Sequence, residues 1–591
     1  MTSTGTTNYL WSRHFAAALA GAGLAHVVIS PGARSTPLTL AFLRQAGVRC
    51  HVLVDERSAA FFALGLAKAT ELPVALVCTS GSAPAHWLPA VIEADAGRVP
   101  LLLLSTDRPA ELHGWGANQT VAQAGLFTGF VRAAHALATP EEGFLPRQVH
   151  TLAARLLAEC RWPCPGPVHV NLPFREPLLP PAAKLAASPD LGPVHPPEAP
   201  PPLVLPAPHA VAQAAARLSG RPGLILAGAL PPGSAGPDYA RAVAALARAL
   251  DCPVLAEPLS GLRHGAAGLE ADSRPDSHHF LAHGEALVRD AAFVAAQAPA
   301  WILRCGDAQV SRSLQTWLSQ CLDQGTELLL LEGEGRWPDP ERGTTLLLRG
   351  DTAATLAALA QAVAAKAPPA WMQAWRAAEQ RAGDLARAAL DAAGDDLWEG
   401  AVVADLLAAL PAESRLFWGN SMAVRDGDSF SGLSAKPLEE HGNRGCSGID
   451  GQLSTALGLA AAGSAEGRYS AALLGDLAAH HDLNALAAAR ELDCLLVVVN
   501  NGGGGIFEYL PARALPEYET GWLTPVPLVL AHGAAAYGVP YRRAASRAEF
   551  QAAIAEAVAT GGPWLVEAVV ERSESVARHR AYWQAVSGSE S

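Results

Sequence analysis

The stretch YSAALLGDLAAHHDLNALAAARELDCLLVVVNNGGGGIFEYLP, residues 469–511, decides the fold class. Its two apolar runs, Ser470–Leu474 and Leu495–Val499, are typical of buried strands. The pattern between them predicts a helix over Asp482–Glu491. A strand, a helix and a second strand of this length form a βαβ unit, so we expect a parallel sheet covered by helices on its faces.

Polar residues follow both predicted strands. Gly475–Asp476 comes after the first strand, and Asn500–Asn501 with the glycines Gly502–Gly505 comes after the second. Ligands of parallel sheets bind beyond the carboxyl ends of the strands, so these residues are candidates for one site. Carboxylate and amide oxygens suit Mg²⁺, and glycine backbone lets a bulky ligand approach closely. An ordinary βαβ unit with a glycine-rich loop, or another kind of nucleotide site, has the same pattern.

Composition limits the classes of protein that this chain can belong to. Its 591 residues are too many for one core, and two to four domains are expected. Half of the residues are hydrophobic and 17% are charged, which indicates a globular protein. The formal net charge of −13 argues against nonspecific nucleic-acid binding. It also makes any cluster of arginines notable, because the overall field repels anionic substrates.

The cysteines and the N-terminus indicate the compartment. The nine cysteines form no metal or disulfide framework, since the nearest pair, Cys160 and Cys164, has no second pair to complete a zinc site. Scattered thiols suit a reducing cytosol. The N-terminal residues 1–15 contain no apolar signal core, and no apolar run reaches membrane-spanning length. We expect a cytoplasmic protein without a membrane partner.

Alternating strand and helix patterns recur along the chain. In the first segment the expected strands are His26–Ser30, His51–Val54, Val74–Cys78, Pro100–Ser105 and Val168–Leu172, and the expected helices are Leu10–Ala22, Pro37–Gln45, Ser58–Thr70, Ala83–Ala96 and Arg147–Cys160. We predict an α/β chain of three doubly wound domains. Its parts are a first domain (1–180), a proline-rich linker (181–208), a second domain (209–366), a linker helix (367–399) and a third domain (400–591).

Candidate functional loops follow the predicted strands. They are Ser30–Leu38, Asp55–Arg57, Thr79–Ser82, Thr106–Pro109 with Gly116–Gln119, Trp418–Arg425 and Asn443–Gly451. A lone glutamate such as Glu56 at a helix start is usually a charge favoured by the helix dipole. A solvated side chain is the default for each of the loop arginines Arg34, Arg108, Arg425 and Arg444. Together they favour a polyanionic substrate, since Arg pairs bidentately with carboxylates.

Ten segments in chain order resemble a known family: SPGARSTPL, DERSAAFFALGLAK, TSGSAPA, TDRPAEL, GANQ, GPVHVNLPFREPL, GNSMAVR, NRGCSGIDG, GDLAAHHDLNAL and VVVNNGGGGIF. They are similar to the 2-succinyl-5-enolpyruvyl-6-hydroxy-3-cyclohexene-1-carboxylate (SEPHCHC) synthases, thiamine diphosphate (ThDP) enzymes of menaquinone biosynthesis. The match is dense over roughly residues 8–178 and 400–511 and loose between them. It implies that the three domains bind the pyrimidine, lie centrally and bind the diphosphate, respectively. The chain departs from the family at Ala33, where a serine is usual, and at Leu477, where the GDG signature has glycine.

The resemblance implies ThDP and Mg²⁺ or Mn²⁺ as cofactors. It assigns Glu56 the catalytic role of hydrogen-bonding N1′ of the aminopyrimidine. The implied metal ligands are Asp476, the Asn501 side chain and the Gly503 carbonyl. The implied cofactor-binding residues are Pro31, Thr79, Ser421, Ile449, Gly475, Asp476, Leu477 and Asn501, with Ile449 as an apolar wedge under the cofactor. The implied substrate-binding residues are Arg34, Arg108, Gln119, Arg312, Ser421, Arg425, Arg444, Ile506 and Phe507.

The implied reaction is the ThDP- and Mg-dependent decarboxylation of 2-oxoglutarate followed by 1,4-addition of the resulting carbanion to isochorismate, which gives SEPHCHC and CO₂. Such an enzyme is a transferase, or carboligase, and its two dicarboxylate substrates would account for the loop arginines. The family's active sites form between the first domain of one chain and the last domain of another. The resemblance therefore implies a homodimer or homotetramer.

Other interpretations stay open. An acetolactate-synthase-like carboligase would share Glu56, Asp476 and Asn501 but would not need these arginines. A catalytically silent protein of the same fold, acting as a binding or regulatory module, is a second alternative. A nucleotide-dependent enzyme is disfavoured, because no Lys-Ser/Thr follows the glycines. His480 and His481 are interpreted as surface or packing histidines.

Overall fold

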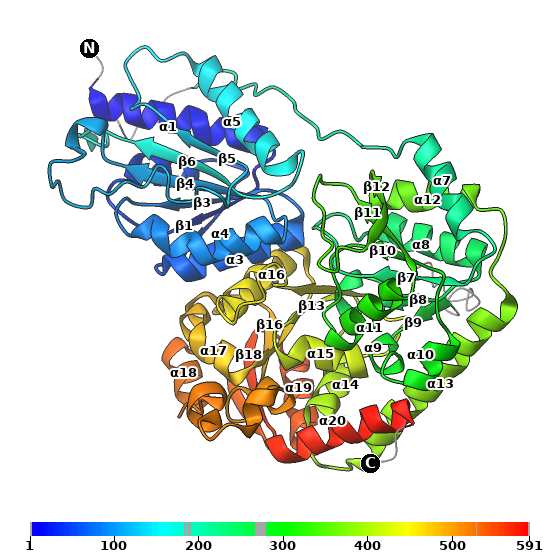
Figure 1. The fold of residues 1–591 in the computed structure, drawn as a ribbon. Helices are drawn as coiled ribbons and strands as arrows, with labels where there is room; N and C mark the ends of the chain where they lie inside the picture. Colours follow the sequence, from blue (N-terminus) through cyan, green and yellow to red (C-terminus); the bar gives the residue numbers. More distant parts are fainter. Residues whose placement is uncertain (1–2, 183–184, 186–190, 266–278, 528, 589–591) are drawn as a thin grey trace. The chain divides into compact units, whose positions relative to one another are not determined.

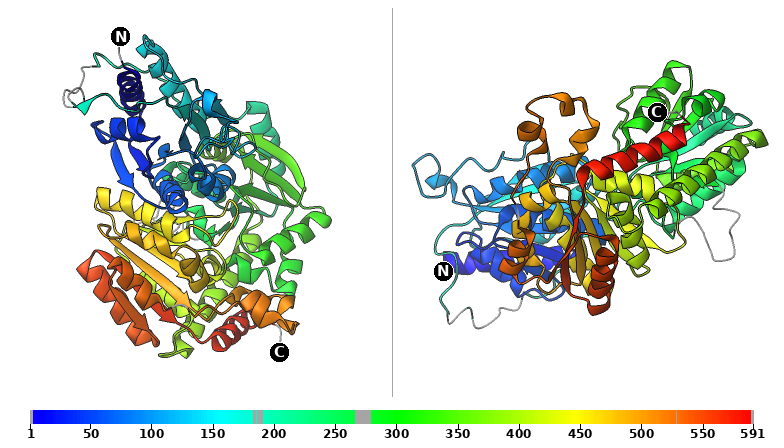
Figure 2. Two further views of the ribbon diagram at one scale, coloured as in Figure 1. Left: turned by 90° about the vertical axis from the view of Figure 1, so that its left-hand side faces the viewer. Right: turned by 90° about the horizontal axis from the view of Figure 1, so that it is seen from below.

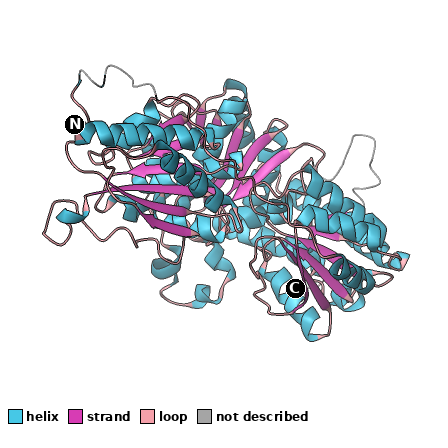
Figure 3. Cartoon of the chain, turned by 90° about the horizontal axis from the view of Figure 1, so that it is seen from above, coloured by secondary structure: helices cyan, strands magenta, loops and turns pink. Residues whose placement is uncertain are grey.

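The structure is a computed structural model that describes residues 3–182, 185, 191–265, 279–527 and 529–588. These residues form three six-stranded sheets (Figure 1). Neighbouring strands are parallel throughout. Figure 3 shows the strands lying between helices. The predicted α/β class with three doubly wound sheets is confirmed.

The first sheet has the strand order β2-β1-β3-β4-β6-β5. Its strands are β1 (His26–Ile29), β2 (Arg49–Val52), β3 (Val74–Cys78), β4 (Leu101–Asp107), β5 (Ala133–Ala136) and β6 (Val168–Pro173). Its helices are α1 (Thr4–Gly21), α2 (Thr36–Leu43), α3 (Glu56–Thr70), α4 (Leu88–Ala96) and α5 (Pro146–Arg161), with the 3₁₀ turns η1 (Ala83–Trp87) and η2 (Ala110–Leu112). In Figure 1, α1 and α5 cover one face and α3 and α4 the other.

The helix expected over Ala83–Ala96 is divided into η1 and α4. Pro84 and Pro89 stand at the first turns of these two elements. Because proline has no backbone N–H and clashes with the preceding turn, a continuous helix cannot pass through Pro89. The edge strand β5 was not expected, since its four residues AAHA are too short and too weakly apolar to give a strand signal.

The second sheet has the order β12-β11-β10-β7-β8-β9. Its strands are β7 (Gly223–Ala227), β8 (Val254–Ala256), β9 (Phe280–Leu281), β10 (Trp301–Cys305), β11 (Glu327–Glu332) and β12 (Thr344–Arg349). Its helices are α7 (Pro208–Leu218), α8 (Pro237–Leu250), α9 (Gly284–Leu287), α10 (Ala291–Ala296), α11 (Arg312–Asp323) and α12 (Thr352–Ala362), with η3 (Pro258–Ser260). The long helix α13 (Pro369–Ala392) occupies most of the expected linker helix.

The third sheet has the order β14-β13-β15-β16-β18-β17, which repeats the order of the first sheet. Its strands are β13 (Ser414–Trp418), β14 (Leu438–Gly442), β15 (Ser470–Gly475), β16 (Cys494–Asn500), β17 (Tyr541–Ala544) and β18 (Pro563–Val569). Along the chain these strands alternate with the helices α14 (Glu399–Ala409), α15 (Met422–Phe430), α16 (Gln452–Glu466), α17 (Asp476–His481), α18 (Leu530–Tyr537), α19 (Arg547–Thr560) and α20 (Arg572–Ser587). Short turns η5 (Leu483–Ala488), η6 (Gly505–Tyr509), η7 (Pro511–Ala514) and η8 (Glu519–Leu523) connect them. The sequence pattern predicts a helix over Leu528–Tyr537; α18 covers its residues from Leu530, and Leu528 lies outside the described residues.

The helix expected over Asp482–Glu491 was wrong. The chain instead forms α17 directly after β15, and then the 3₁₀ turn η5. Asp482 lies between the two elements and is fully buried. Its carboxylate accepts hydrogen bonds from the backbone N–H (2.7 Å) and the hydroxyl (3.0 Å) of Ser454. This buried anchor holds the chain where a continuous helix would have to pass.

The chain forms two compact units. The first unit contains residues 1–202, 443–462 and 481–489, and the second contains residues 203–442, 463–480 and 490–591. Within the second unit, α20 lies beside α13 (Figure 2). Each unit has buried apolar clusters around its strands. None of the described helices is both long and apolar enough to span a membrane.

Candidate active site

Two of the predicted substrate arginines lie together in the first unit. Arg108 follows β4, and its guanidinium donates to the Ser80 hydroxyl and to the Gln119 side-chain oxygen (3.1 Å) and carbonyl (3.3 Å). Burial lowers the pKa of Arg108, and the positive charge of Arg34 lowers it further. Arg34, Arg108 and Gln119 therefore share one neighbourhood. A bound anion there would relieve the repulsion between the two guanidinium groups.

Arg34 is buried and partly committed to the fold. Its guanidinium donates one hydrogen bond to the Phe174 carbonyl and one to the Glu176 carboxylate, and both are 2.9 Å long. Its Nε is buried and has no hydrogen-bond partner among the described residues. The side chain of Glu176 is 71% exposed, so the ion pair lies at the surface, where an incoming carboxylate can compete for the guanidinium.

Glu56 is the first residue of α3, at the carboxyl edge of the first sheet. Asp55 caps this helix by accepting from the backbone N–H groups of Arg57 (2.9 Å) and Ser58 (3.4 Å). Burial raises the pKa of the Cys78 thiol, and the negative charge of Glu56 raises it further. Cys78 ends β3, so the charge of Glu56 acts on the strand end that leads into Thr79.

The loops of Pro31 and Thr79, two predicted cofactor-binding positions, pack against each other. A Cβ on Gly32 would lie 2.4 Å from the Cβ of Thr79. Only glycine fits at this position without moving one of the two loops. The loop with Ala33 is thus closely packed even though it lacks the serine usual in the family.

The loop 443–451 belongs to the first unit and is fixed by a glutamate that the sequence analysis did not identify. Glu93 of α4 is buried and accepts from the backbone N–H groups of Gly445 (2.8 Å) and Cys446 (2.6 Å). These bonds hold the segment next to Arg444. In the same loop Ile449, the residue predicted to lie under the cofactor, is 44% exposed. No motif marks Glu93, because it lies within the apolar helix sequence LPAVIEADA.

The predicted metal ligands lie at the carboxyl edge of the third sheet, in the second unit. The Asp476 carboxylate accepts hydrogen bonds of 2.8 Å from the backbone N–H groups of both Leu477 and Gly503. Burial raises the pKa of Asp476 to about 6. Gly503 has φ +126°, and a Cβ there would lie 2.1 Å from the Leu523 carbonyl oxygen. The glycine loop is therefore tied to Asp476 in a conformation that other residues cannot adopt.

Asn501 supplies the observation that tests whether these residues fit a metal. Its side-chain oxygen is buried and has no hydrogen-bond partner among the described residues. A buried polar atom without a partner is costly, and a divalent cation would satisfy it. No group of three or more His, Cys, Asp and Glu side chains forms a metal site in the described part of the chain. The expected set of one carboxylate, one amide oxygen and one carbonyl suits a hard cation such as Mg²⁺, which keeps waters and phosphate oxygens as its other ligands.

Ser421 lies directly before α15, and Arg425 lies near the start of that helix. Ser421 has φ +66° and ψ −124°, a strained conformation for a residue with a Cβ and one that is common at functional sites. Arg425 donates to the Ser421 carbonyl over 2.6 Å. Burial lowers the pKa of Arg425, and the carboxylates of Asp426 and Asp428 oppose this effect. Its charge is thus held in a half-buried position at the start of α15.

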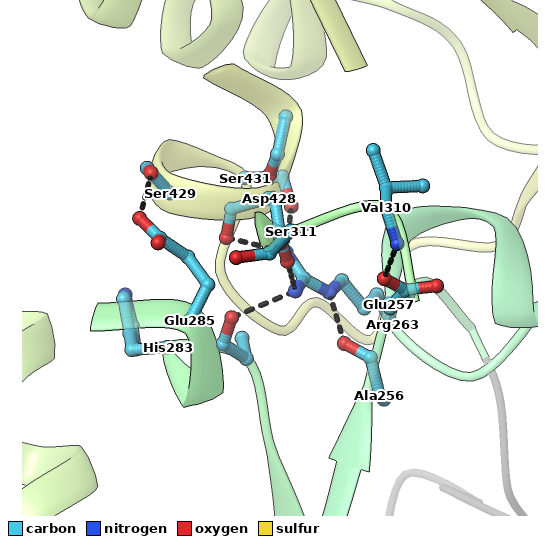
Figure 4. Close-up of polar contacts among 12 residues, drawn as sticks. Ala256, Glu257, Arg263, His283, Glu285, Val310, Ser311, Asp428, Ser429 and Ser431 are labelled. Carbon is cyan, nitrogen blue, oxygen red and sulfur yellow. Dashed lines mark hydrogen bonds and ion pairs between the residues drawn. The ribbon is translucent and has the colours of Figure 1, made fainter. Parts of the chain in front are cut away.

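A buried ion pair anchors the other end of α15 (Figure 4). Arg263 donates to the Ala256 carbonyl (2.6 Å), the Ala282 carbonyl (2.7 Å) and the Asp428 carboxylate. It also donates to the Ser431 hydroxyl over 3.0 Å. Burial raises the pKa of Asp428 to about 6, although the charge of Arg263 pulls it down. Since Arg263 joins α15 to the end of β8, this network fixes the helix that carries Arg425.

The remaining predicted residues have less definite surroundings. Ile506 and Phe507 are half-buried on η6, directly after the glycine loop. Arg312 is exposed at the start of α11, and no described contact joins it to the other candidate residues. His480 and His481 are exposed, in agreement with their interpretation as surface residues.

A buried cluster of ionisable groups lies beside Asn501 and was also missed from the sequence. Glu399 of α14 accepts from Asn501 and from the Ser575 hydroxyl, and the His579 ring lies 3.0 Å from the Asp426 carboxylate. Burial raises the pKa of Glu399 to about 7, against the pull of His579. Burial lowers the pKa of His579, but the hydrogen bond and charge of Asp426 outweigh it and raise the pKa to about 9.

Known proteins resemble this chain over nearly its whole length. Residues 11–126 match the N-terminal TPP binding domain of thiamine pyrophosphate enzymes, and residues 431–568 match their C-terminal TPP binding domain. The chain is 43% identical over 568 residues to the SEPHCHC synthase of Dechloromonas aromatica (strain RCB), covering 96% of this chain and 99% of that protein. It is 39% identical over 586 residues to the SEPHCHC synthase of Geobacillus thermodenitrificans (strain NG80-2), and the alignment covers 97% of this chain and 95% of that protein.

A solved structure supports the fold. The benzoylformate decarboxylase of Polynucleobacter necessarius has a TM-score of 0.67 with this chain. The alignment has 18% identity and covers 95% of this chain and 98% of that one. At this identity the likeness concerns the fold alone.

Proposed function

The chain belongs to the SEPHCHC synthase family of ThDP-dependent enzymes, and on this premise we propose that it decarboxylates 2-oxoglutarate and joins the remaining four-carbon unit to isochorismate. The product of this reaction is SEPHCHC, and its place is menaquinone biosynthesis. The observation that carries the choice of substrates is the cluster of Arg34, Arg108 and Gln119 in a protein of net charge −13. Two cations in one neighbourhood suit dicarboxylates better than the single carboxylate of pyruvate.

The residues of the second unit are proposed to hold the cofactor's metal. Asp476, the Asn501 side-chain oxygen and the Gly503 carbonyl would coordinate Mg²⁺ or Mn²⁺, and this cation would hold the diphosphate of ThDP. Bound ThDP supplies an electron sink for the pair of electrons left on the substrate's carbonyl carbon when CO₂ departs. Ser421, Gly475 and Leu477 would line the diphosphate and thiazolium side of the site.

The residues of the first unit are proposed to handle protons and charge. Glu56 would hold a proton at N1′ of the pyrimidine, with Pro31 and Thr79 beside the ring and Ile449 as the apolar support. Arg108 and Gln119 would orient one carboxylate of the substrate. Arg34 would exchange its surface-exposed partner Glu176 for another carboxylate.

The remaining candidates are proposed for the acceptor. Arg425 and Arg444 would neutralise the carboxylates of isochorismate, and Ile506 with Phe507 would contact its ring. Arg312, which is exposed at the start of α11, is proposed as a further substrate-binding arginine. We further propose a cytoplasmic homodimer or homotetramer in which each site takes residues from two chains.

The test is consumption of 2-oxoglutarate that depends on isochorismate, with ThDP and Mg²⁺ added and the product identified by its mass. We expect consumption only when both substrates and both cofactors are present. Pyruvate, offered in place of 2-oxoglutarate, serves as the comparison. A strong preference for pyruvate would overturn the proposal in favour of an acetolactate-synthase-like carboligase.

A further inference from the structure

Two neighbouring asparagines at the end of β16 are held in the same way. The side-chain NH₂ of Asn500 donates to Glu567 over 2.6 Å, and that of Asn501 donates to Glu399 over 3.2 Å. Both glutamates are 6% exposed. Each asparagine therefore gives its nitrogen to a buried carboxylate, which makes the pair a natural comparison within one chain.

The two asparagines differ at the oxygen. The side-chain oxygen of Asn500 accepts from the backbone N–H of Gly502 over 3.2 Å. The side-chain oxygen of Asn501 is buried and has no partner among the described residues. Both ends of the Asn500 amide thus have hydrogen-bond partners, whereas the oxygen of the Asn501 amide has none among the described residues. A buried acceptor is kept without a partner only at a cost, so a ligand is the expected partner.

The carboxyl group of Glu399 determines which end of the Asn501 amide, the NH₂ or the oxygen, stays available to a ligand. The two ends of an amide have nearly the same shape, but one donates and the other accepts. The Glu399 oxygen that faces Asn501 accepts from the NH₂, so the amide oxygen is turned away from Glu399. Without this acceptor, the amide would lose its preference and could offer its NH₂, which cannot coordinate a cation, to the metal position.

Glu399 is itself held in place by residues of α20. Its second oxygen accepts from the Ser575 hydroxyl of α20. One turn further along α20, the His579 ring lies 3.0 Å from Asp426 of α15 and packs against Trp398 at a centroid distance of 5.2 Å. Trp398 is the residue before Glu399, so the backbone that carries the carboxylate is held as well as the carboxylate itself.

We propose that Glu399 is a positioning residue of the metal site: by accepting the NH₂ of Asn501 it keeps the amide oxygen turned toward the divalent cation. This inference rests on the proposed metal site and goes beyond it, because Glu399 contacts neither substrate nor cofactor. Outer-shell partners of metal ligands commonly control affinity in this way.

The experiment measures Mn²⁺ affinity of the full-length protein at saturating ThDP, from the EPR signal of free Mn²⁺. Glu399→Met fills the same space without an acceptor, and we expect it to weaken Mn²⁺ binding by about 10- to 100-fold. The matched control is Glu567→Met, which removes the same kind of contact from Asn500. Since the oxygen of Asn500 is already satisfied by Gly502, we expect a change of no more than about threefold.

Two further variants separate orientation from charge and from folding. Glu399→Gln is neutral but still offers an oxygen to Asn501, and we expect its affinity to stay within about fivefold of the original. Asn501→Asp, added to Glu399→Met, should restore most of the lost affinity, because a carboxylate presents oxygen whichever way it turns. If Glu399→Met does not fold, Ser575→Ala, which frees one oxygen of Glu399, should still weaken Mn²⁺ binding by about two- to fivefold.

Three results would overturn the positioning role of Glu399, and a fourth would overturn the proposed metal site together with it. Unchanged Mn²⁺ affinity in Glu399→Met and Ser575→Ala would overturn the positioning role while leaving the proposed metal site intact. A loss in Glu399→Gln as large as in Glu399→Met would show that the charge and not the hydrogen bond matters. A loss that Asn501→Asp fails to restore would show a purely structural role. If the original protein binds no Mn²⁺ with ThDP, the metal site and this inference fall together.

Discussion

Glu56 is the side chain for which we expect the largest effect on turnover. Glu56→Gln keeps the size and the helix position but cannot hold the proton that a carboxylate shares with N1′. We expect carboligation to fall by about 10²- to 10⁴-fold. ThDP binding, measured by calorimetry, should change little, since the metal ligands are untouched. Glu71→Gln, an exposed position at the other end of α3, is the control. Unaltered turnover in Glu56→Gln would contradict the assigned role.

His169 gives a prediction for stability against pH. It is fully buried in β6 beside the Ser105 hydroxyl (2.7 Å), and burial lowers its pKa from 6.5 to about 4. The folded state therefore binds the proton less readily than the unfolded chain. Its contribution to stability is fully present above pH 6.5 and is lost as the pH falls towards 4. Such a shift corresponds to about 3 kcal/mol.

The measurement compares His169→Gln with the original protein by urea denaturation between pH 7 and pH 4.5. The variant is expected to be less stable at pH 7 but to lose less of its free energy of unfolding on acidification. The burial of His51 lowers the pKa of that residue in the same direction, so a residual slope will remain. Parallel curves for the two proteins would show that His169 is not the group that titrates.

Sequence reasoning finds some of these side chains and not others, for a physical reason. Arg108, Asp476 and Asn501 directly follow strands, where a charged or amide side chain indicates a candidate site. Glu93 and Glu399 sit on helices, where a glutamate normally indicates solvent or a favourable helix dipole. Their role depends on which loop or amide lies opposite each carboxylate. That contact joins residues far apart in the chain, and no local pattern encodes it.

Helix α4 holds the loop 443–451 through the hydrogen bonds that Glu93 accepts from Gly445 and Cys446. Glu93→Gln replaces one of the two acceptor oxygens by an NH₂, which then faces a backbone N–H of Gly445 or Cys446. Hydrogen bonds to a charged acceptor contribute about 1.5–3 kcal/mol each. We expect faster amide exchange in the loop and a higher KM for isochorismate, because Arg444 loses its support.

The control for this loop is Glu111→Gln, the same substitution in a surface ion pair with Arg175. It should leave both amide exchange and KM unchanged, since exposed ion pairs contribute little. If the loop exchanged at its original rate in Glu93→Gln, the two backbone hydrogen bonds would not be what fixes it. A change in turnover alone, without a change in KM, would also contradict the predicted support of Arg444.

The same contrast between local and distant information explains which helices and strands were predicted. Buried runs such as Val74–Cys78 and Leu495–Val499 are recognisable because every residue is apolar. The strand β14, with the sequence LEEHG, was missed because its residues are mostly polar and it lies at a sheet edge. The helix expected over Asp482–Glu491 was wrong because Asp482 is held by Ser454, a contact that the hydrophobic pattern does not contain.

The repetition of one strand order in the first and third sheets bears on the assembly. Both sheets have the order 2-1-3-4-6-5 when their strands are numbered within each sheet. Each presents its candidate residues at the carboxyl edge, with Glu56 in the first unit and Asp476 in the second. Linkers and composition predict the parts of the chain but not which copy supplies each half of a site. That question needs an experiment on mixed chains.

Complementation between two inactive variants answers it. Glu56→Gln damages only the proton-holding half of the site, and Asp476→Asn damages only the metal-binding half. If each site takes Glu56 from one chain and Asp476 from another, a mixed dimer has one site with both defects and one site with neither. Purification through both tags leaves only mixed dimers, in which one of the two sites is intact, so we expect about half of the original activity. The two variants are co-expressed with different tags, purified through both tags and assayed for carboligation beside each variant alone. Sites built within one chain would each keep one defect, and the mixed dimers would then be as inactive as the parents.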